Sequence, residues 1–266
     1  MNPTTIHPKI TLVGAGPGDP ELMTMKGMKA LWSADVVLYD ALVNPDILKE
    51  APENAVKVYV GKRANNHRYS QDEINLMLVQ FAFTHGHVVR LKGGDSFVFG
   101  RGHEELQFAK AFDIETTVVP GISSCISVPE LQEVPLTRRG LNESFWVLTG
   151  TTRSGALSED IQLAAQSSAT AVILMGMRKL PQIADIFSAH GKTNTPAMVI
   201  QSGSLPEEKV VLGTVKDIAQ KVEKEGLGSP GIIIIGEVVK LHPELNYEAV
   251  DKSLQLQDIT RIKNAH

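Results

Sequence analysis

Two hydrophobic periods alternate along the first half of this chain. Short runs of β-branched and apolar residues predict strands at 10–13, 35–39, 56–60, 88–91 and 116–119. Apolar residues that recur every three or four positions predict helices over 24–33, from 74 to near 86, and from 104 onward, with a short helix after Asn44. Ser70-Gln-Asp-Glu73 is a capping box ahead of one of them. This alternation of strand, turn and helix is typical of a mostly parallel sheet covered by helices.

The same alternation resumes in the second half. It predicts strands at 145–149, 171–175, 197–201, 210–212 and 232–235, and helices at 160–166, 180–190 and 215–223. Only a short turn separates 197–201 from 210–212, so these two strands are expected to pair as an antiparallel hairpin.

Proline and glycine interrupt the pattern between the halves, at Pro129, Pro135 and Gly140. We therefore predict two α/β domains with a ligand cleft between them. The expected boundaries are 1–128 for the first domain, 129–143 for a connection, 144–242 for the second domain and 243–266 for a tail.

The predicted strands end in polar, glycine-rich segments. Open α/β sheets bind ligands beyond the carboxyl ends of their strands, so these segments are where a ligand is expected. They come from both halves: 14–19, 40, 61–63, 92–95, 121–124, 175–176 and 202–203. This distribution predicts a ligand held between the two domains.

The stretch 88–105 carries the clearest candidate site. A predicted strand ends there in Gly93-Gly94-Asp95, and Glu104-Glu105 open the next helix. Paired glycines let backbone amides approach a ligand, and Asp95 supplies a charged acceptor. The alternative is an ordinary strand–turn–helix joint, in which Asp95 only caps the turn.

Two common phosphate-binding motifs are absent. After Gly14 and Gly16, a dinucleotide-binding turn requires a third glycine at position 19, which is Asp19. The P-loop spacing does not occur either, so neither NAD nor ATP is supported.

Composition narrows the class of protein. The 266 residues contain no apolar run of the roughly 18 to 20 residues that a membrane span needs, and the first residues do not resemble a signal peptide, so we expect a cytoplasmic protein that does not enter the membrane. The single cysteine, Cys125, excludes an internal disulfide and is expected to be a buried apolar residue rather than a nucleophile.

The net charge of −4 argues against a nucleic-acid partner. Basic residues nevertheless cluster between positions 60 and 102, at Lys62, Arg63, Arg68, Arg90, Lys92 and Arg101. A local cationic pocket in an acidic protein indicates a small polyanionic ligand, with ordinary solvated surface charge as the alternative.

Eight blocks occur in a fixed order: Gly14-Ala-Gly-Pro-Gly-Asp-Pro, Val37-Leu-Tyr-Asp-Ala-Leu-Val, Val60-Gly-Lys-Arg-Ala, Arg90-Leu-Lys-Gly-Gly-Asp, Phe97-Val-Phe-Gly-Arg-Gly, Val119-Pro-Gly-Ile-Ser-Ser, Val134-Pro-Leu-Thr-Arg and Gly236-Glu-Val-Val. Together they resemble the tetrapyrrole methyltransferases, and Lys-Gly-Gly-Asp with Phe-Gly-Arg-Gly is typical of the members that act on uroporphyrinogen III. The resemblance covers residues 10 to about 242. It implies a homodimer with the family's own two-domain α/β fold, which is not a Rossmann fold.

The resemblance also implies a reaction and its residues. Members methylate two pyrrole carbons of uroporphyrinogen III with S-adenosylmethionine, giving precorrin-2 for sirohaem or cobalamin, and the tetrapyrrole's carboxylates would use the cationic cluster. The implied cofactor residues are Pro17, Gly93, Gly94, Asp95, Val98, Ser123, Ser124, Met175 and Gly203. The implied catalytic residues are Asp40, Lys62, Arg101 and Glu104.

These residues suggest how the proton chemistry could work without a metal. After attack on the methyl group the ring must lose a proton, and Asp40 could accept it; alternatively, Asp40 caps the next turn. Lys62 is more suited to donating a proton or binding a carboxylate. Arg101, which stays protonated, is expected to anchor a carboxylate and to be oriented by Glu104.

Some positions depart from the family's usual pattern, namely Ser96, His103, Arg138 and the segment 127–133. They lie toward the expected substrate side. Two other interpretations therefore stay open: a methyltransferase of the same superfamily acting on a later corrin precursor or another acceptor, and a non-catalytic protein that binds the cofactor or a tetrapyrrole.

Overall fold

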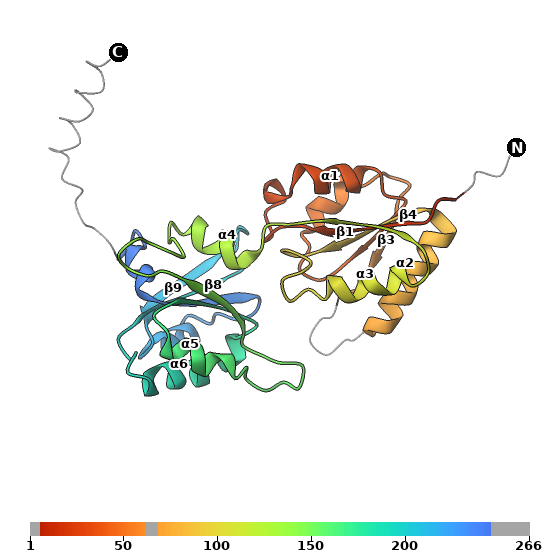
Figure 1. Cartoon of the computed structure of the whole chain (residues 1–266). Coiled ribbons are helices and arrows are strands. Elements are labelled where there is room, and N and C mark those ends of the chain that lie inside the picture. The colour runs from red at the N-terminus through yellow and green to blue at the C-terminus, as the bar shows by residue number, and fades with distance from the viewer. Residues whose placement is uncertain (1–5, 62–68, 246–266) are drawn as a thin grey trace, which may run out of the picture.

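The computed structural model describes residues 6–61 and 69–245, and it contains two five-stranded sheets that lie side by side (Figure 1). Lys62, Arg63, Arg68 and residues 246–266 of the predicted tail lie outside the described residues. The predicted α/β fold class is confirmed, with one sheet in each half of the chain.

All strands of the first sheet are parallel, as the alternation predicts. Their order is β3-β2-β4-β1-β5. The strands are β1 (Lys9–Gly14), β2 (Val36–Tyr39), β3 (Val56–Tyr59), β4 (His87–Lys92) and β5 (Glu115–Val119). Because every strand runs the same way, the polar segments that follow them meet at one edge of the sheet.

Helices cover both faces of this sheet (Figure 1). The helices are η1 (Pro20–Leu22), α1 (Met25–Trp32), η2 (Pro45–Glu50), α2 (Gln71–His85) and α3 (Gly102–Lys110). One core cluster joins α1 and η2 to one face, and a second joins α2 and α3 to the other. The predicted capping box begins α2: the Ser70 hydroxyl accepts from Glu73 N, and the Glu73 carboxylate accepts from Ser70 N.

The second sheet mixes directions. Its strands are β6 (Phe145–Thr149), β7 (Thr170–Leu174), β8 (Pro196–Gln201), β9 (Lys209–Thr214) and β10 (Gly231–Ile235), in the order β6-β7-β10-β8-β9. Only β6 and β7 pair in parallel. The predicted hairpin of β8 and β9 is confirmed as antiparallel. α5 (Asp160–Gln166), α6 (Leu180–Ala189) and α7 (Ile218–Lys224) share one core cluster with the sheet.

Helix α4 (Ser124–Leu131) joins the two halves. It belongs to the core of the second sheet, because Cys125 and Val128 pack in one cluster with Val172, Met198 and Ile234. The predicted start of the connection at residue 129 falls within this helix: Pro129 lies inside α4, which ends two residues later. Proline removes only one hydrogen bond here, close to the helix end, where packing holds the turn. We propose a domain boundary ahead of Ser124.

The burial of Cys125 agrees with its expected role as a small apolar residue. Burial raises the pKa of its thiol, which disfavours the thiolate. Within the described parts of the chain, no helix is both long and apolar enough to cross a bilayer.

Candidate functional site

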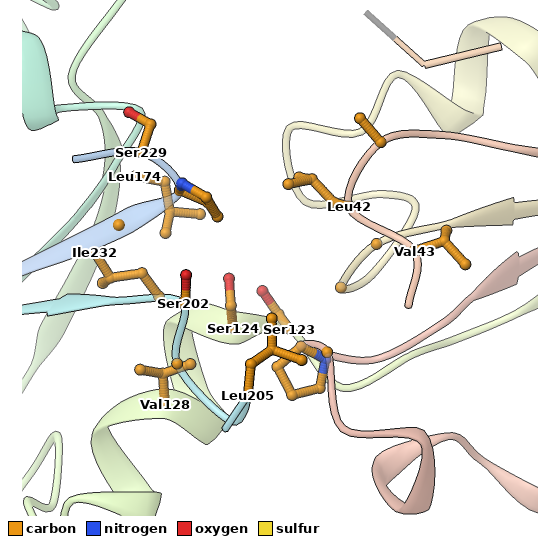
Figure 2. A pocket seen from close by; sticks show the side chains of 18 of the residues that line it. Leu42, Val43, Ser123, Ser124, Val128, Leu174, Ser202, Leu205, Ser229 and Ile232 are labelled. Carbon is orange, nitrogen blue, oxygen red and sulfur yellow. The ribbon is translucent and has the colours of Figure 1, made fainter. Parts of the chain in front are cut away.

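A cavity of about 820 Å³ lies between the carboxyl edge of the first sheet and the loops of the second. Loops that follow β1, β2, β4 and β5 form one wall, and loops that follow β7 and β8 and precede β10 form the other. Figure 2 shows Leu42 and Val43 on one side of the cavity, facing Leu174, Ser229 and Ile232 on the other. The structure therefore contains a cavity where the sequence predicts a cleft.

Most of the predicted site residues meet in this cavity. All the predicted cofactor residues line it: Pro17, Gly93, Gly94, Asp95, Val98, Ser123, Ser124, Met175 and Gly203. Of the predicted catalytic residues, Asp40 and Arg101 line it, Glu104 does not, and Lys62 lies outside the described residues. Residues far apart in the chain are thus brought together, while the role of each stays a prediction.

Three glycines make this edge of the first sheet possible. A Cβ on Gly14 would lie 2.5 Å from Gly121 N and 2.7 Å from Gly94 O, so no other residue fits without moving the backbone. The loops after β1, β4 and β5 cross at this point. Gly94 N donates to Gly16 O at 2.6 Å and Gly16 N donates to Gly94 O at 3.2 Å, which links the first two loops.

Asp95 links the third loop. Its Oδ1 accepts from Phe97 N at 2.8 Å, and its Oδ2 accepts from Gly121 N at 2.9 Å. A carboxylate that accepts two backbone N–H groups forms charge-assisted bonds, which are stronger than neutral ones. Asp95 thus holds the β4–α3 loop against the β5–α4 loop, so the turn-capping alternative describes part of its role.

A buried ion cluster lies behind the same wall. Residues 88, 90 and 92 of β4 point to the face covered by α2 and α3, where Arg90 and Lys92 meet Glu105. Glu105 Oε1 lies 3.2 Å from Arg90 Nε and 3.1 Å from Lys92 Nζ, and it accepts from Gln71 Nε2 at 3.1 Å. The side chains of Arg90, Lys92 and Glu105 are 4%, 6% and 0% exposed, so water screens these charges little.

Burial and charge act in opposite directions on Glu105. Burial favours its neutral form, but attraction to Arg90 and Lys92, together with hydrogen bonds from Gln71 and Lys92, outweighs this, and the pKa of Glu105 lies below its ordinary value. Burial, followed by repulsion from Arg90, lowers the pKa of Lys92. The cluster therefore contains a stable carboxylate and an ammonium that gives up its proton more easily than a solvated lysine.

Asp40 lies beside this cluster. Its Oδ1 accepts from Leu42 N at 3.2 Å and from Gly93 N at 3.4 Å, and its Oδ2 lies 3.8 Å from Arg90 Nη2. The side chain is 25% exposed and lines the cavity. Asp40 thus caps a turn while one oxygen faces a guanidinium, an arrangement compatible with both roles that the sequence leaves open.

Arg101 and Glu104 pair on the surface. Two bonds join them, from Arg101 Nε to Glu104 Oε1 at 3.0 Å and from Nη2 to Oε2 at 2.5 Å. Both side chains are about half exposed. Glu104 therefore holds the guanidinium of Arg101, and of the two residues only Arg101 lines the cavity.

The described residues of the predicted cationic cluster do not all face the cavity. Lys92 and Arg101 line the cavity, whereas the guanidinium of Arg90 is buried, donating to Glu105 and to the carbonyls of Leu38 and Leu91. The expectation that Arg90 faces a ligand is wrong, because the chain supplies its carboxylate from α3. A signal for this was present: two charges alternate with apolar residues in β4, and a glutamate follows on the next helix.

The opposite wall is mainly apolar, and two of its turns contain residues with positive φ angles. Met175 and Ser202 adopt positive φ angles of 56° and 52°, which turns the chain sharply after β7 and β8. A Cβ on Gly203 would lie 2.5 Å from Val128 Cγ1, so glycine lets this loop pack on α4. Asp19 N donates to Ser204 Oγ at 3.1 Å, a bond that joins the two walls at one end of the cavity.

The structure shows the surroundings of two of the positions that depart from the family's usual pattern, Ser96 and His103. The Ser96 side chain is fully buried, and its hydroxyl has no partner within the described residues. The ring of His103 packs edge-on against Phe97 with centroids 6.3 Å apart. Both belong to the loop and helix that follow β4, close to Arg101.

The family model of the tetrapyrrole (corrin/porphyrin) methylases matches residues 9–219. The chain is 44% identical over 235 residues to the uroporphyrinogen-III C-methyltransferase of Methanocaldococcus jannaschii, an alignment that covers 88% of this chain and 97% of that protein. It is 41% identical over 246 residues to a siroheme synthase of Actinobacillus pleuropneumoniae, covering 92% of this chain but 50% of that protein.

The fold of this chain is also similar to that of a solved structure. It is the uroporphyrin-III C-methyltransferase from Thermus thermophilus complexed with S-adenosylhomocysteine, with a TM-score of 0.76 and 38% sequence identity. The match covers 88% of this chain and 99% of that one.

The buried cluster generates a stability prediction. Glu105→Gln should lower the free energy of unfolding by about 3 to 5 kcal/mol, because it leaves Arg90 and Lys92 without their shared charge partner. Glu104→Gln is the matched control: its carboxylate pairs with Arg101 in solvent, so its loss should cost no more than about 1 kcal/mol. Urea unfolding of both variants measures the difference, and equal losses would show that the cluster does not behave as a buried ion pair.

Proposed function

Because this chain belongs to the tetrapyrrole methylase family, we propose that it methylates uroporphyrinogen III at two pyrrole carbons with S-adenosylmethionine, giving precorrin-2. The observation that carries the proposal is the cavity between the sheets, in which all the predicted cofactor residues converge. The uroporphyrinogen-III C-methyltransferase that is 44% identical to this chain supports uroporphyrinogen III as the acceptor, since the alignment covers 97% of that protein.

The cavity suits the cofactor chemically. The apolar wall, with Leu174, Met175 and Ile232, offers surface for the adenosine part, and the hydroxyls of Ser123 and Ser124 offer polar contacts. A Cβ on Gly94 would meet nothing closer than 3.9 Å, so the backbone there leaves open space beside Ser124. When bound, S-adenosylmethionine supplies a methyl group on a positively charged sulfur. We propose Pro17, Gly93, Gly94, Asp95, Val98, Ser123, Ser124, Met175 and Gly203 as its binding residues.

The protein's contribution to methyl transfer is alignment and exclusion of water. The pyrrole carbon must approach the methyl group in line with the breaking bond, so fixed walls can supply much of the rate enhancement. Arg101, held by Glu104 at the rim, is placed to bind a carboxylate of the acceptor. Asp40 is the proposed proton acceptor, and Lys62 stays a predicted proton donor or carboxylate ligand.

The pathway and the assembly are further parts of the proposal. Precorrin-2 leads to sirohaem or cobalamin, and the chain spans about half the length of the siroheme synthases that it matches. We propose a homodimer in the cytoplasm, from the family resemblance and the composition of the chain. A later corrin precursor remains an alternative acceptor, because Ser96, His103 and Arg138 depart from the family's usual pattern.

The function is tested by an anaerobic assay with S-adenosylmethionine labelled in its methyl group. We expect two labelled methyl groups on each uroporphyrinogen III, and no transfer when the tetrapyrrole is omitted. Binding of both ligands without transfer would favour a non-catalytic protein. Transfer to a later corrin precursor alone would favour the alternative enzyme.

Asp40→Asn separates a proton acceptor from a turn cap. Asparagine caps nearly as well as aspartate, so the fold and cofactor binding should persist. If Asp40 accepts the proton, the single-turnover rate should fall by about 10² to 10⁴. A fall of less than about threefold, with cofactor affinity unchanged, would assign Asp40 to capping alone.

A further inference from the structure

Lys92 is the most deeply buried cation in the cavity wall of the described chain. Its side chain is 6% exposed, yet it lines the cavity from the last position of β4. The ammonium makes one hydrogen bond within the described residues, to Glu105 Oε1 at 3.1 Å. An ammonium has three donors, so two of them are left in a place with little water.

The charges around Lys92 are crowded. The groups that face it are Arg90 on its own strand, Glu105 from α3 and Asp40 from the end of β2. Arg90 and Lys92 share one oxygen of Glu105, while Glu105 Oε2 has no partner in the described residues. The other charged residues of the cavity have partners of their own or lie elsewhere. Asp95 accepts from two backbone amides, Arg101 pairs with Glu104, and Glu207 lies on the opposite wall.

A further positive charge in this cavity, added to that of Arg90 behind the wall, would make the ammonium form of Lys92 costly. The cofactor of the proposed function brings such a charge on its sulfur, and like charges close together in a poorly screened site disfavour each other. Its product, a thioether, carries no charge on sulfur. The two ligands therefore differ most in how they interact with a nearby cation.

We propose that Lys92 binds S-adenosylmethionine as a neutral amine, releasing its proton when the sulfonium enters and recovering a proton after methyl transfer. This inference rests on the proposed function. Burial and the neighbouring Arg90 already lower the pKa of Lys92, against the opposing effect of Glu105 and Asp40, and a sulfonium in the cavity would lower it further. The protonation state of Lys92 would thus set the relative affinity of the site for S-adenosylmethionine and for S-adenosylhomocysteine, whose sulfur is uncharged.

In this scheme, the positive charge on the cofactor's sulfur and the charge on Lys92 are not present at the same time. When bound, the cofactor would give up the positive charge on its sulfur as its methyl group moves to the tetrapyrrole, which would then carry that charge. When a ring C–H bond breaks, its electron pair stays with the ring, and the proton passes to the Nζ lone pair of Lys92, with Asp40 as the proposed carrier. Reprotonated Lys92 regains its ammonium form when only the neutral thioether is left beside it.

The sign of the pH dependence follows. Since S-adenosylmethionine prefers neutral Lys92, its affinity should rise with pH, by up to about tenfold per pH unit below the midpoint of Lys92, and level off above it. The affinity for S-adenosylhomocysteine should change much less over the same range, because its thioether does not repel the ammonium.

Calorimetry of the wild-type protein tests this without turnover. Each ligand is titrated in buffers of different ionisation heat, which counts the protons released on binding. We expect S-adenosylmethionine to release a proton and S-adenosylhomocysteine to release much less. Equal release by both ligands, or none by either, overturns the inference. If neither ligand binds at all, the proposed function fails, which is a distinct result.

Variants then assign the proton to Lys92. Lys92→Met has no charge to lose and should bind S-adenosylmethionine with little proton release. Lys92→Arg keeps a fixed cation and should weaken S-adenosylmethionine by more than about tenfold relative to S-adenosylhomocysteine at every pH. Lys57→Met, on the exposed side of β3, is the matched control and should behave as the wild type. Wild-type proton release in Lys92→Met would assign the proton to another group and overturn the inference.

Discussion

The contact of Gly14, Gly94 and Gly121 is the constraint on which the site depends. At this point three backbones lie closer than any side chain permits: a Cβ on Gly14 would sit 2.5 Å from Gly121 N. The crossing brings the loops after β1, β4 and β5 into one surface, and Asp95 fixes that surface through Gly121 N. If these three loops were free to move, the cavity would have no fixed wall. The glycines therefore preorganise the site, because they let the loops pack directly against one another.

The two walls of the cavity divide the chemistry. The first sheet supplies most of the charges, including Asp40, Lys92 and Arg101, because four of its parallel strands, β1, β2, β4 and β5, end at the cavity. The second sheet supplies mainly an apolar surface and tight turns such as Met175. A reaction between a charged methyl donor and a polycarboxylate needs both kinds of wall: an apolar one that excludes water, and a charged one that binds carboxylates and exchanges protons.

Much of this arrangement could be predicted from the sequence, and the failures have physical reasons. Hydrophobic periods predict the strands and helices, and glycine at strand ends predicts the cavity loops. Strand direction in the second sheet could not be read, because β10 inserts between β7 and β8 and pairs antiparallel with both, which depends on tertiary contacts. Pro129 suggested a break, yet packing of Val128 carries α4 past it. Likewise, the charge of Arg90 suggested a ligand, and only the fold shows that Glu105 satisfies it.

The most direct test of the account is a crystal structure of this protein with S-adenosylhomocysteine. We predict the ligand in the cavity between the sheets, with its polar groups near Gly93–Asp95 and Ser123–Ser124 and its thioether sulfur closer to Lys92 than to any other lysine of the described chain. A ligand bound outside this cavity, or bound within it with Lys92 turned away and sealed off by Glu105, would contradict the account.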